Sequence, residues 1–170
     1  MSDLNIRPAG DADLSAINDI YNHYVLHSTS TYQETPEPLE GRQEWFAAHG
    51  ESHPITVATL EGVVVGWGSL SPYHRRSAFR YTVENSVYVR PDRQRHGIGS
   101  ALLADLIERA TALGYHSIIA AIDGEQAPSI ALHAKFGFTH AGVLREAGLK
   151  FGRWLDVVYM QKTTGASDQG

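Results

Sequence analysis

The chain has 170 residues, of which 42% are hydrophobic and 19% are charged, proportions that are ordinary for a single globular domain. Its formal net charge of −5 argues against a general nucleic-acid binder, because such proteins usually carry a basic excess. The sequence contains no cysteine, which excludes a disulfide framework, a thiolate metal site and a catalytic thiol.

The N-terminal segment lacks a basic stretch followed by an apolar run, which is the pattern of a signal peptide. No segment approaches the roughly 20 consecutive apolar residues that a membrane-spanning helix needs. We therefore expect a cytoplasmic protein without a membrane partner.

The N-terminal half of the sequence alternates between helical and strand periodicity. Asp11 or Asp13 is placed to cap the first helix, and Glu61-Gly62 is suited to the tight turn of a hairpin. The expected elements are, in chain order, a strand over residues 4–8, a helix ending near residue 26, a helix over 39–49, and paired strands over 55–60 and 63–70.

The C-terminal half contains the strongest predicted helix, whose apolar stripe ends at Leu113 and which stops at Gly114. The expected elements are a strand over 79–89, this helix over 97–113, a buried strand over 117–122, a helix over 128–136, and a closing antiparallel pair over 138–144 and 155–161. We predict a single α+β domain over residues 1–162. The small polar residues 163–170 predict a disordered tail.

The segment Gln94-Arg95-His96-Gly97-Ile98-Gly99-Ser100 follows a predicted strand and begins a helix. Backbone N–H groups at a helix start point outward, and the helix dipole adds partial positive charge there. Gly97 and Gly99 remove side chains that would hold a phosphate away from these groups. The pattern predicts a ligand with closely spaced phosphates, although the glycines alone are equally compatible with a plain connecting loop.

Two common phosphate-binding motifs do not fit this segment. Leu102 stands where the dinucleotide motif requires its third glycine, and the sequence has no Gly-Lys-Ser/Thr triplet of a nucleotide-triphosphate loop. The remaining pattern is Gln/Arg-x-x-Gly-x-Gly/Ala after a strand.

This pattern resembles the acyl-CoA pyrophosphate signature of the GNAT (Gcn5-related N-acetyltransferase) superfamily. The resemblance extends from Ile6 to Gln161 in the order of elements. More narrowly, the segments 82–89, 129–133 and 150–156 resemble the phosphinothricin and methionine sulfoximine or sulfone acetyltransferases.

The resemblance implies the GNAT fold: a central mixed, mostly antiparallel twisted sheet of about seven strands, flanked by about four helices. It also implies an N-acetyltransferase that uses acetyl-CoA as co-substrate, needs no metal and binds no nucleic acid. A homodimer is expected through the closing strand pair, which includes Trp154.

The resemblance further implies a cofactor site along the strand that ends at Val89. The pantetheine arm would pair with the backbone of Val87, Tyr88 and Val89, and an N–H group near Val89 would polarise the thioester carbonyl. Gln126 stands where the subgroup usually has an asparagine that contacts the pantetheine. The pyrophosphate would meet the N–H groups of Arg95, His96, Gly97, Ile98, Gly99 and Ser100.

Two residues are candidates for proton transfer. Glu84 matches the proposed catalytic glutamate of the subgroup, and partial burial would raise its pKa toward the range of a general base; the alternative is an exposed strand carboxylate. His133 stands where many family members have tyrosine. It either protonates the leaving CoA thiolate or packs as a hydrogen-bonded side chain.

The basic loop over residues 73–80 suggests the acceptor. A small substrate with an amine, a carboxylate and a second oxygenated group would attract arginine forks. His74 stands where related enzymes often have arginine, and Arg75 or Arg76 is placed to substitute. The predicted acceptor-binding residues are Glu34, Arg75, Ser77, Ala78, Phe79 and Arg80.

The favoured hypothesis is direct acetyl transfer, in a ternary complex, to the α-amine of a small amino-acid-like substrate of the phosphinothricin, methionine sulfoximine or methionine sulfone type. Two alternatives stay open. The acceptor could be a protein N-terminus or a lysine side chain, or the chain could be a non-catalytic acyl-CoA-binding module.

Overall fold

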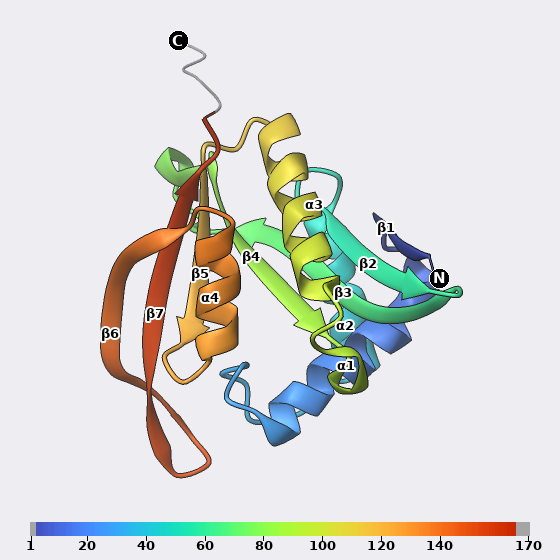
Figure 1. Cartoon of the computed structure of the whole chain (residues 1–170), viewed down its shortest axis with the longest axis horizontal. Coiled ribbons are helices and arrows are strands. Elements are labelled where there is room, and N and C mark those ends of the chain that lie inside the picture. Colours follow the sequence, from blue (N-terminus) through green and yellow to red (C-terminus); the bar gives the residue numbers. More distant parts are fainter. Residues whose placement is uncertain (1–2, 166–170) are drawn as a thin grey trace.

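One seven-stranded sheet organises the fold (Figure 1). In the computed structural model, which describes residues 3–165, the strands pair in the order β1-β2-β3-β4-β5-β7-β6. All neighbouring strands are antiparallel except β4 and β5, which are parallel. The strands are β1 (Leu4–Pro8), β2 (Ile55–Leu60), β3 (Val63–Pro72), β4 (Thr82–Val89), β5 (Ser117–Asp123), β6 (Thr139–Lys150) and β7 (Arg153–Thr163).

Helices cover both faces of this sheet. Helices α3 and α4 lie on one face, and α1 and α2 lie on the other (Figure 1). The helices are α1 (Leu14–His27), α2 (Leu39–His49), α3 (Ile98–Ala112) and α4 (Ala127–Lys135). This architecture confirms the expected mostly antiparallel α+β sheet of seven strands with four helices. Within residues 3–165, no helix has both the length and the apolar character required to cross a membrane.

Strand alternation divides the core between the two faces. On the α3 face, Val83 of β4 packs in one cluster with Leu103 and Leu106. On the α1 face, Trp67 of β3 packs with Ile17. Successive β4 side chains point to opposite faces of the sheet. Odd-numbered residues such as Val83 therefore face α3, and even-numbered residues such as Tyr88 face α1.

The parallel pairing between β4 and β5 is short. It joins Thr82 to Ser117, Val83 to Ile118 and Glu84 to Ile119, and it ends there. Beyond Glu84 the two strands part, as Figure 1 shows. The second half of β4 therefore pairs with β3 on one side but not with β5, across the gap, on the other, and we call this unpaired side the open edge of β4.

Three predictions about local structure are wrong. The strand expected to begin at Phe79 begins at Thr82, because residues 77–79 form a 3₁₀ turn with an i→i+3 hydrogen bond from Arg80 N–H to Ser77 O. Asp13 stands at the N-cap position of α1, but its side chain does not cap the helix, since its carboxylate accepts from Arg7 and from the Gly10 N–H. Leu113 lies just after α3 and is 47% exposed.

The closing strands are longer than expected. Strands β6 and β7 pair from Thr139 to Lys150 with a register shift between Leu144 and Gly148, which sequence periodicity alone would read as a strand end. The tail was expected to begin at residue 163. However, Thr163 belongs to β7, and the N–H of Thr164 donates to His116 O at 3.0 Å. The rest of the predicted tail, residues 166–170, lies outside the described residues.

Candidate active site

The open edge of β4 exposes a defined set of backbone groups. The N–H of Arg90 donates to Val65 O at 2.8 Å, so alternate residues of β4 hydrogen-bond β3. By this alternation, Val87 and Val89 direct their N–H and C=O groups away from β3 and into the gap, whereas the backbone of Tyr88 faces β3. Of the three residues predicted to pair with a pantetheine arm, Val87 and Val89 therefore have backbone groups aimed toward the gap.

The predicted phosphate-binding turn follows β4 after a short 3₁₀ turn, Pro91–Arg93. Arg95 and Gly97 have left-handed φ angles of 65° and 76°, and Gly97 is the N-cap of α3. The N–H of Ala101 closes the first helical turn onto Gly97 O at 3.0 Å. The N–H groups of Ile98, Gly99 and Ser100 precede that bond and face outward from the helix start. This geometry suits an anion.

Glu84 is the last β4 residue paired with β5, and its side chain lies on the α1 face. It is half-buried, and burial raises the pKa of its carboxyl group above the ordinary value. Its charge also acts on Tyr159 of β7. Burial raises the pKa of the Tyr159 hydroxyl, and the nearby Glu84 carboxylate raises it further. The structure thus supports a partly buried carboxyl beside the gap, not a fully exposed strand residue.

His133 is buried on the opposite face of the sheet, with 4% of its surface exposed. Its Nδ1 lies 2.8 Å from Ser129 O, and its Nε2 lies 3.0 Å from Asn85 Nδ2. Because a carbonyl oxygen only accepts, Nδ1 must carry the proton, and Nε2 then accepts from the Asn85 amide. Burial lowers the pKa of His133, which favours this neutral form.

Gln126 is the N-cap of α4, at the end of the loop that follows β5. Its amide Nε2 donates to Thr29 Oγ1 at 3.2 Å. Thr29 in turn donates to the buried carboxylate of Asp123, the last residue of β5. The Gln126 side chain is thus held at the start of α4 by a network that sequence patterns did not suggest.

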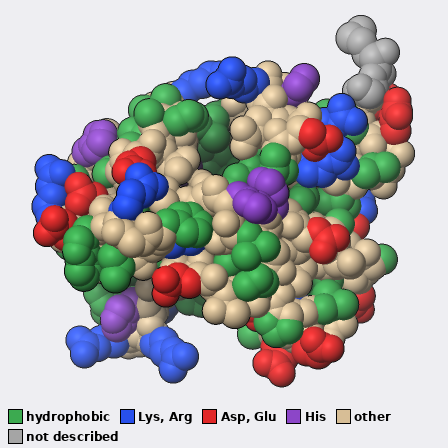
Figure 2. Space-filling view, turned by 90° about the horizontal axis from the view of Figure 1, so that it is seen from below, with side chains coloured by type: hydrophobic (Ala, Val, Ile, Leu, Met, Phe, Trp, Pro, Cys, Tyr) green, Lys and Arg blue, Asp and Glu red, His purple; other side chains and the backbone are tan. Residues whose placement is uncertain are grey.

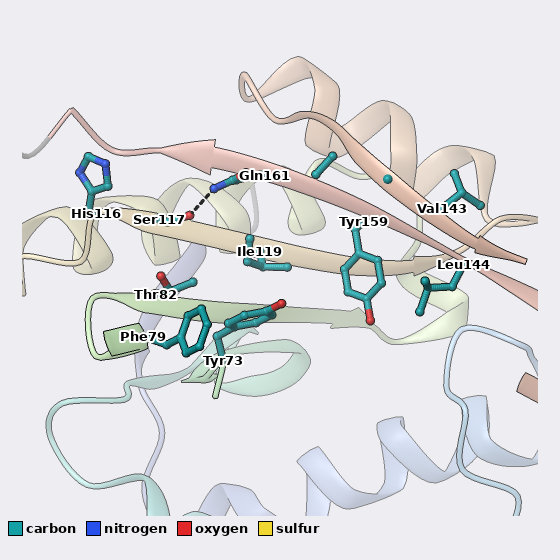
Figure 3. A pocket seen from close by; sticks show the side chains of 12 residues that line it. Tyr73, Phe79, Thr82, His116, Ser117, Ile119, Val143, Leu144, Tyr159 and Gln161 are labelled. Atoms are coloured by element: carbon teal, nitrogen blue, oxygen red, sulfur yellow. Dashed lines mark hydrogen bonds between the residues drawn. The ribbon is translucent and has the colours of Figure 1, made fainter. Parts of the chain in front are cut away.

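A pocket of about 640 Å³ lies on the same face of the sheet as Glu84 (Figure 3). Figure 3 shows Tyr73 and Phe79 on one side and the Tyr159 ring projecting from β7 toward β4. No Arg, Lys, Asp or Glu is among the lining residues in the described part of the chain. They are Tyr73, Phe79, Thr82, His116, Ser117, Ile119, Ala141, Gly142, Val143, Leu144, Tyr159 and Gln161.

The structure separates the predicted acceptor-binding residues. Phe79 lines the pocket, whereas Arg75, Ser77 and Ala78 lie in the exposed loop outside its lining. Arg80 stacks its guanidinium 4.6 Å from the centre of the Tyr81 ring and donates to Ser77 O. Glu34 is exposed in the loop between α1 and α2, and its charge acts on Lys150. Burial lowers the pKa of the Lys150 ammonium, and the Glu34 charge partly offsets that effect.

Charge is mixed on the surface that Figure 2 shows, where basic and acidic side chains are interspersed among hydrophobic ones. Among residues 3–165, no group of three or more His, Cys, Asp or Glu side chains is arranged to hold a metal ion.

Sequence reasoning missed three residues that shape this region. Tyr24 lies within the first predicted helix and no local pattern marks its hydroxyl, which contacts the end of β4. Asn85 and Tyr159 were not singled out, because their partners are 48 residues away for Asn85 and on another strand for Tyr159. Alternation along β4 predicts that Asn85 lies on the opposite face of the sheet from Glu84, but it does not predict that His133 is the partner of Asn85.

The sequence profile of the Acetyltransferase (GNAT) family matches residues 17–138, which is more than half of the chain. The chain belongs to the GNAT family. The match runs from within α1 to just beyond α4 and includes the whole of the open β4 edge and the turn that follows it.

Individual GNAT relatives are similar over almost the whole chain. An L-methionine sulfoximine/L-methionine sulfone acetyltransferase from Pseudomonas paraeruginosa is 46% identical over 159 residues, covering 92% of each chain. The crystal structure of a phosphinothricin acetyltransferase from Sinorhizobium meliloti in complex with AcCoA has a TM-score of 0.92 at 40% identity, covering 96% of this chain and 89% of that one. A ribosomal-protein-alanine N-acetyltransferase structure from Brucella melitensis has a TM-score of 0.92 at 43% identity, covering 94% and 99%.

The neutral, buried state of His133 predicts a pH-dependent stability. Its folded pKa is below the ordinary value of about 6.5, so as the pH is lowered through that value the unfolded chain takes up a proton before the folded chain does. The free energy of unfolding should therefore decrease as the pH is lowered, by at most ~1.4 kcal/mol per pH unit for this residue. His133→Gln should reduce that slope in urea titrations, and the exposed His23→Gln should leave it unchanged. Equal slopes in the wild type and His133→Gln would contradict the neutral buried assignment.

Proposed function

We propose that this GNAT chain is an acetyl-CoA-dependent N-acetyltransferase. The observation that carries the proposal is the continuity of one strand: β4 holds Glu84, then the backbone of Val87 and Val89 facing the gap, and then runs into the anion-binding turn before α3. A donor with an amide-rich arm and a pyrophosphate matches this order of groups. The relative solved in complex with AcCoA supports the same donor.

The acetyl-CoA would bind with its arm in the gap between β4 and β5. The N–H and C=O groups of Val87 are placed to pair with it as an added strand would, whereas the Val89 carbonyl already accepts from the Tyr24 hydroxyl. The N–H groups of Ile98, Gly99 and Ser100, with Arg95 and His96 beside them, would bind the pyrophosphate. The Val89 N–H would polarise the thioester carbonyl.

Glu84 is proposed as the general base. It would remove a proton from the acceptor ammonium, directly or through water, because only a neutral amine has the lone pair needed for attack. The amine nitrogen then forms a bond to the acetyl carbon, the carbon–sulfur bond breaks, and CoA leaves as the thiolate. The second proton that the nitrogen loses on becoming an amide passes to the thiolate or to water, so CoA is released as the thiol or the thiolate. Transfer is direct in a ternary complex, which agrees with the absence of cysteine from the sequence.

His133 is proposed to position the site and not to act as the acid. Both of its ring nitrogens have partners in the folded chain, Ser129 O and the Asn85 amide. With Nδ1–H donating and Nε2 accepting, the ring has no second proton to give to a thiolate.

The proposed acceptor is a small amino-acid-like amine that enters from the pocket on the Glu84 face. The relatives that act on methionine sulfoximine, methionine sulfone and phosphinothricin support this class. Arg75, Arg76 and Arg80 lie in the exposed loop that carries Tyr73 and Phe79, both in the pocket lining, and are placed to attract an anionic substrate.

A protein acceptor is the second candidate. The similarity to a ribosomal-protein-alanine N-acetyltransferase favours it, as does a pocket that opens to solvent on an exposed part of the sheet. A regulatory acyl-CoA-binding module is the third, and the raised pKa of Glu84 argues against it.

The acceptor class is tested by free-thiol release from acetyl-CoA. The panel should contain amino acids, methionine sulfone, methionine sulfoximine, phosphinothricin, polyamines and peptides with N-terminal alanine. We expect turnover with the small amino-acid-like acceptors. Turnover with peptides only would replace the proposed acceptor class, and CoA binding without turnover on any acceptor would favour the regulatory module.

Glu84→Gln should leave the affinity for acetyl-CoA nearly unchanged and lower kcat by roughly 10²–10⁴-fold. In the wild type, the rate should rise with pH through the raised pKa of Glu84, because only the carboxylate accepts a proton. The variant should lose this rise. The matched control is Glu44→Gln, since Glu44 is exposed on α2. A rate and pH profile equal to the wild type would exclude Glu84 as the base.

A homodimer is proposed through β6 and β7. Apolar side chains stand exposed at this end of the sheet, with Trp154 61% exposed and Phe151 54% exposed. Other exposed members are Val143, Leu144 and Leu149. A second copy of the chain would cover them at the sheet edge.

Light scattering after size exclusion tests the dimer. The wild type should have twice the mass of one chain, and Trp154→Glu should shift it toward one chain because a buried unpaired charge would destabilise the contact. The control is Leu26→Glu, an exposed apolar residue on α1. A wild type that is monomeric at assay concentration would contradict the proposal.

A further inference from the structure

The hydroxyl of Tyr24 joins three elements around the proposed cofactor turn. It donates to the carbonyl oxygen of Val89, the last residue of β4, and it accepts from Gln94 Nε2 at 2.7 Å. Tyr24 itself lies on α1. One phenolic oxygen therefore connects the first helix, the end of the open strand and the first residue of the turn.

This arrangement uses both hydrogen-bonding capacities of the phenol, one O–H donor and an acceptor lone pair. The partner on β4 is the Val89 carbonyl, which alternation directs toward the gap and away from β3. The ring is held in place by packing, with ring centroids 5.6 Å from Tyr88 and 5.5 Å from His23. Burial raises the pKa of the Tyr24 hydroxyl, so the group keeps its proton for donation.

Gln94 is held from a second direction as well. Its backbone carbonyl oxygen lies 2.7 Å from Nδ1 of the His96 ring. The next residue, Arg95, has a φ of 65°, a conformation that costs energy for a residue with a side chain. Such a conformation persists where its surroundings hold it. The two contacts of Gln94 supply that hold immediately before the strained residue.

We propose that Tyr24 is a positioning residue that preorganises the anion-binding turn, acting through Val89 and Gln94 without touching the ligand. A turn fixed before binding presents its N–H groups without the cost of ordering them in the complex. The proposal also gives the glutamine of the Gln-x-x-Gly-x-Gly pattern a structural task in this chain, because its side chain is bonded to Tyr24. It rests on the proposed function, in which this turn binds acetyl-CoA.

The test is calorimetric titration of CoA into Tyr24→Phe. This variant keeps the ring and removes both hydrogen bonds of the hydroxyl. We expect the Kd for CoA to rise about tenfold, the size expected for loss of one to two net hydrogen bonds. At saturating acetyl-CoA, kcat and the KM for the acceptor should stay within about twofold of the wild type, because Glu84 and the pocket are untouched.

Gln94→Ala provides the second arm. If Gln94 acts through Tyr24, the double variant should bind CoA no more weakly than the weaker single variant. Additive losses would mean that Gln94 contacts the ligand independently, which would overturn the proposal. Gln94 is exposed, so its variant should fold even if Tyr24→Phe does not, and unchanged CoA affinity in Gln94→Ala would then overturn the proposal on its own.

The matched control is Tyr115→Phe. Its hydroxyl also makes a hydrogen bond to a backbone carbonyl, Ser52 O at 2.7 Å, and a contact with a second side chain, His53 at 3.2 Å. Its affinity for CoA should equal that of the wild type. A wild type that does not bind CoA would refute the proposed function, whereas CoA binding that is equal in the wild type and Tyr24→Phe would refute this inference alone.

Discussion

The early end of the pairing between β4 and β5 is the constraint on which the rest of this structure depends. A parallel neighbour normally satisfies the full edge of a strand, but here the ladder stops at Glu84 while β4 continues to Val89. Backbone groups at an unpaired edge need partners. The chain satisfies one of them itself, through the Tyr24 hydroxyl on Val89 O, and the others face a gap that an extended ligand can enter.

Strand alternation turns this gap into a site with two sides. Glu84 projects toward α1 and the pocket, and Asn85, the next residue, projects toward α4 and His133. The carboxyl proposed as the base on one face, and the amide that binds the buried, neutral His133 on the other, thus follow from adjacent positions in one strand. The acceptor amine and the acyl donor can then approach the same point from different directions, as direct transfer requires.

Local signals in the sequence predicted much of this. The glycine turn, the apolar stripe of α3 as far as Ala110 and the hairpin at Glu61-Gly62 rest on contacts between near neighbours, and the structure has them where they were expected. Features set by distant partners were not predictable. The start of β4 depends on where β5 first pairs with it, the length of β6 depends on an irregular register with β7, and Tyr24 meets a carbonyl 65 residues away. The pocket lining likewise comes from the loop between β3 and β4 together with residues of β4, β5, β6 and β7, which are far apart in the sequence. The arginines of that loop are visible in the sequence as a cluster, whereas the residues that line the pocket are not.

The central claim is that the open edge of β4 and the start of α3 bind the acyl donor, and amide hydrogen exchange followed by NMR tests it most directly. With saturating CoA, the amides of Val87 and Val89 and those of Ile98, Gly99 and Ser100 should become protected from exchange. The amide of Tyr88 faces β3 by strand alternation and should change little. Protection of Tyr88 without Val87 and Val89, or no change at any of these amides when CoA is bound, would contradict the account.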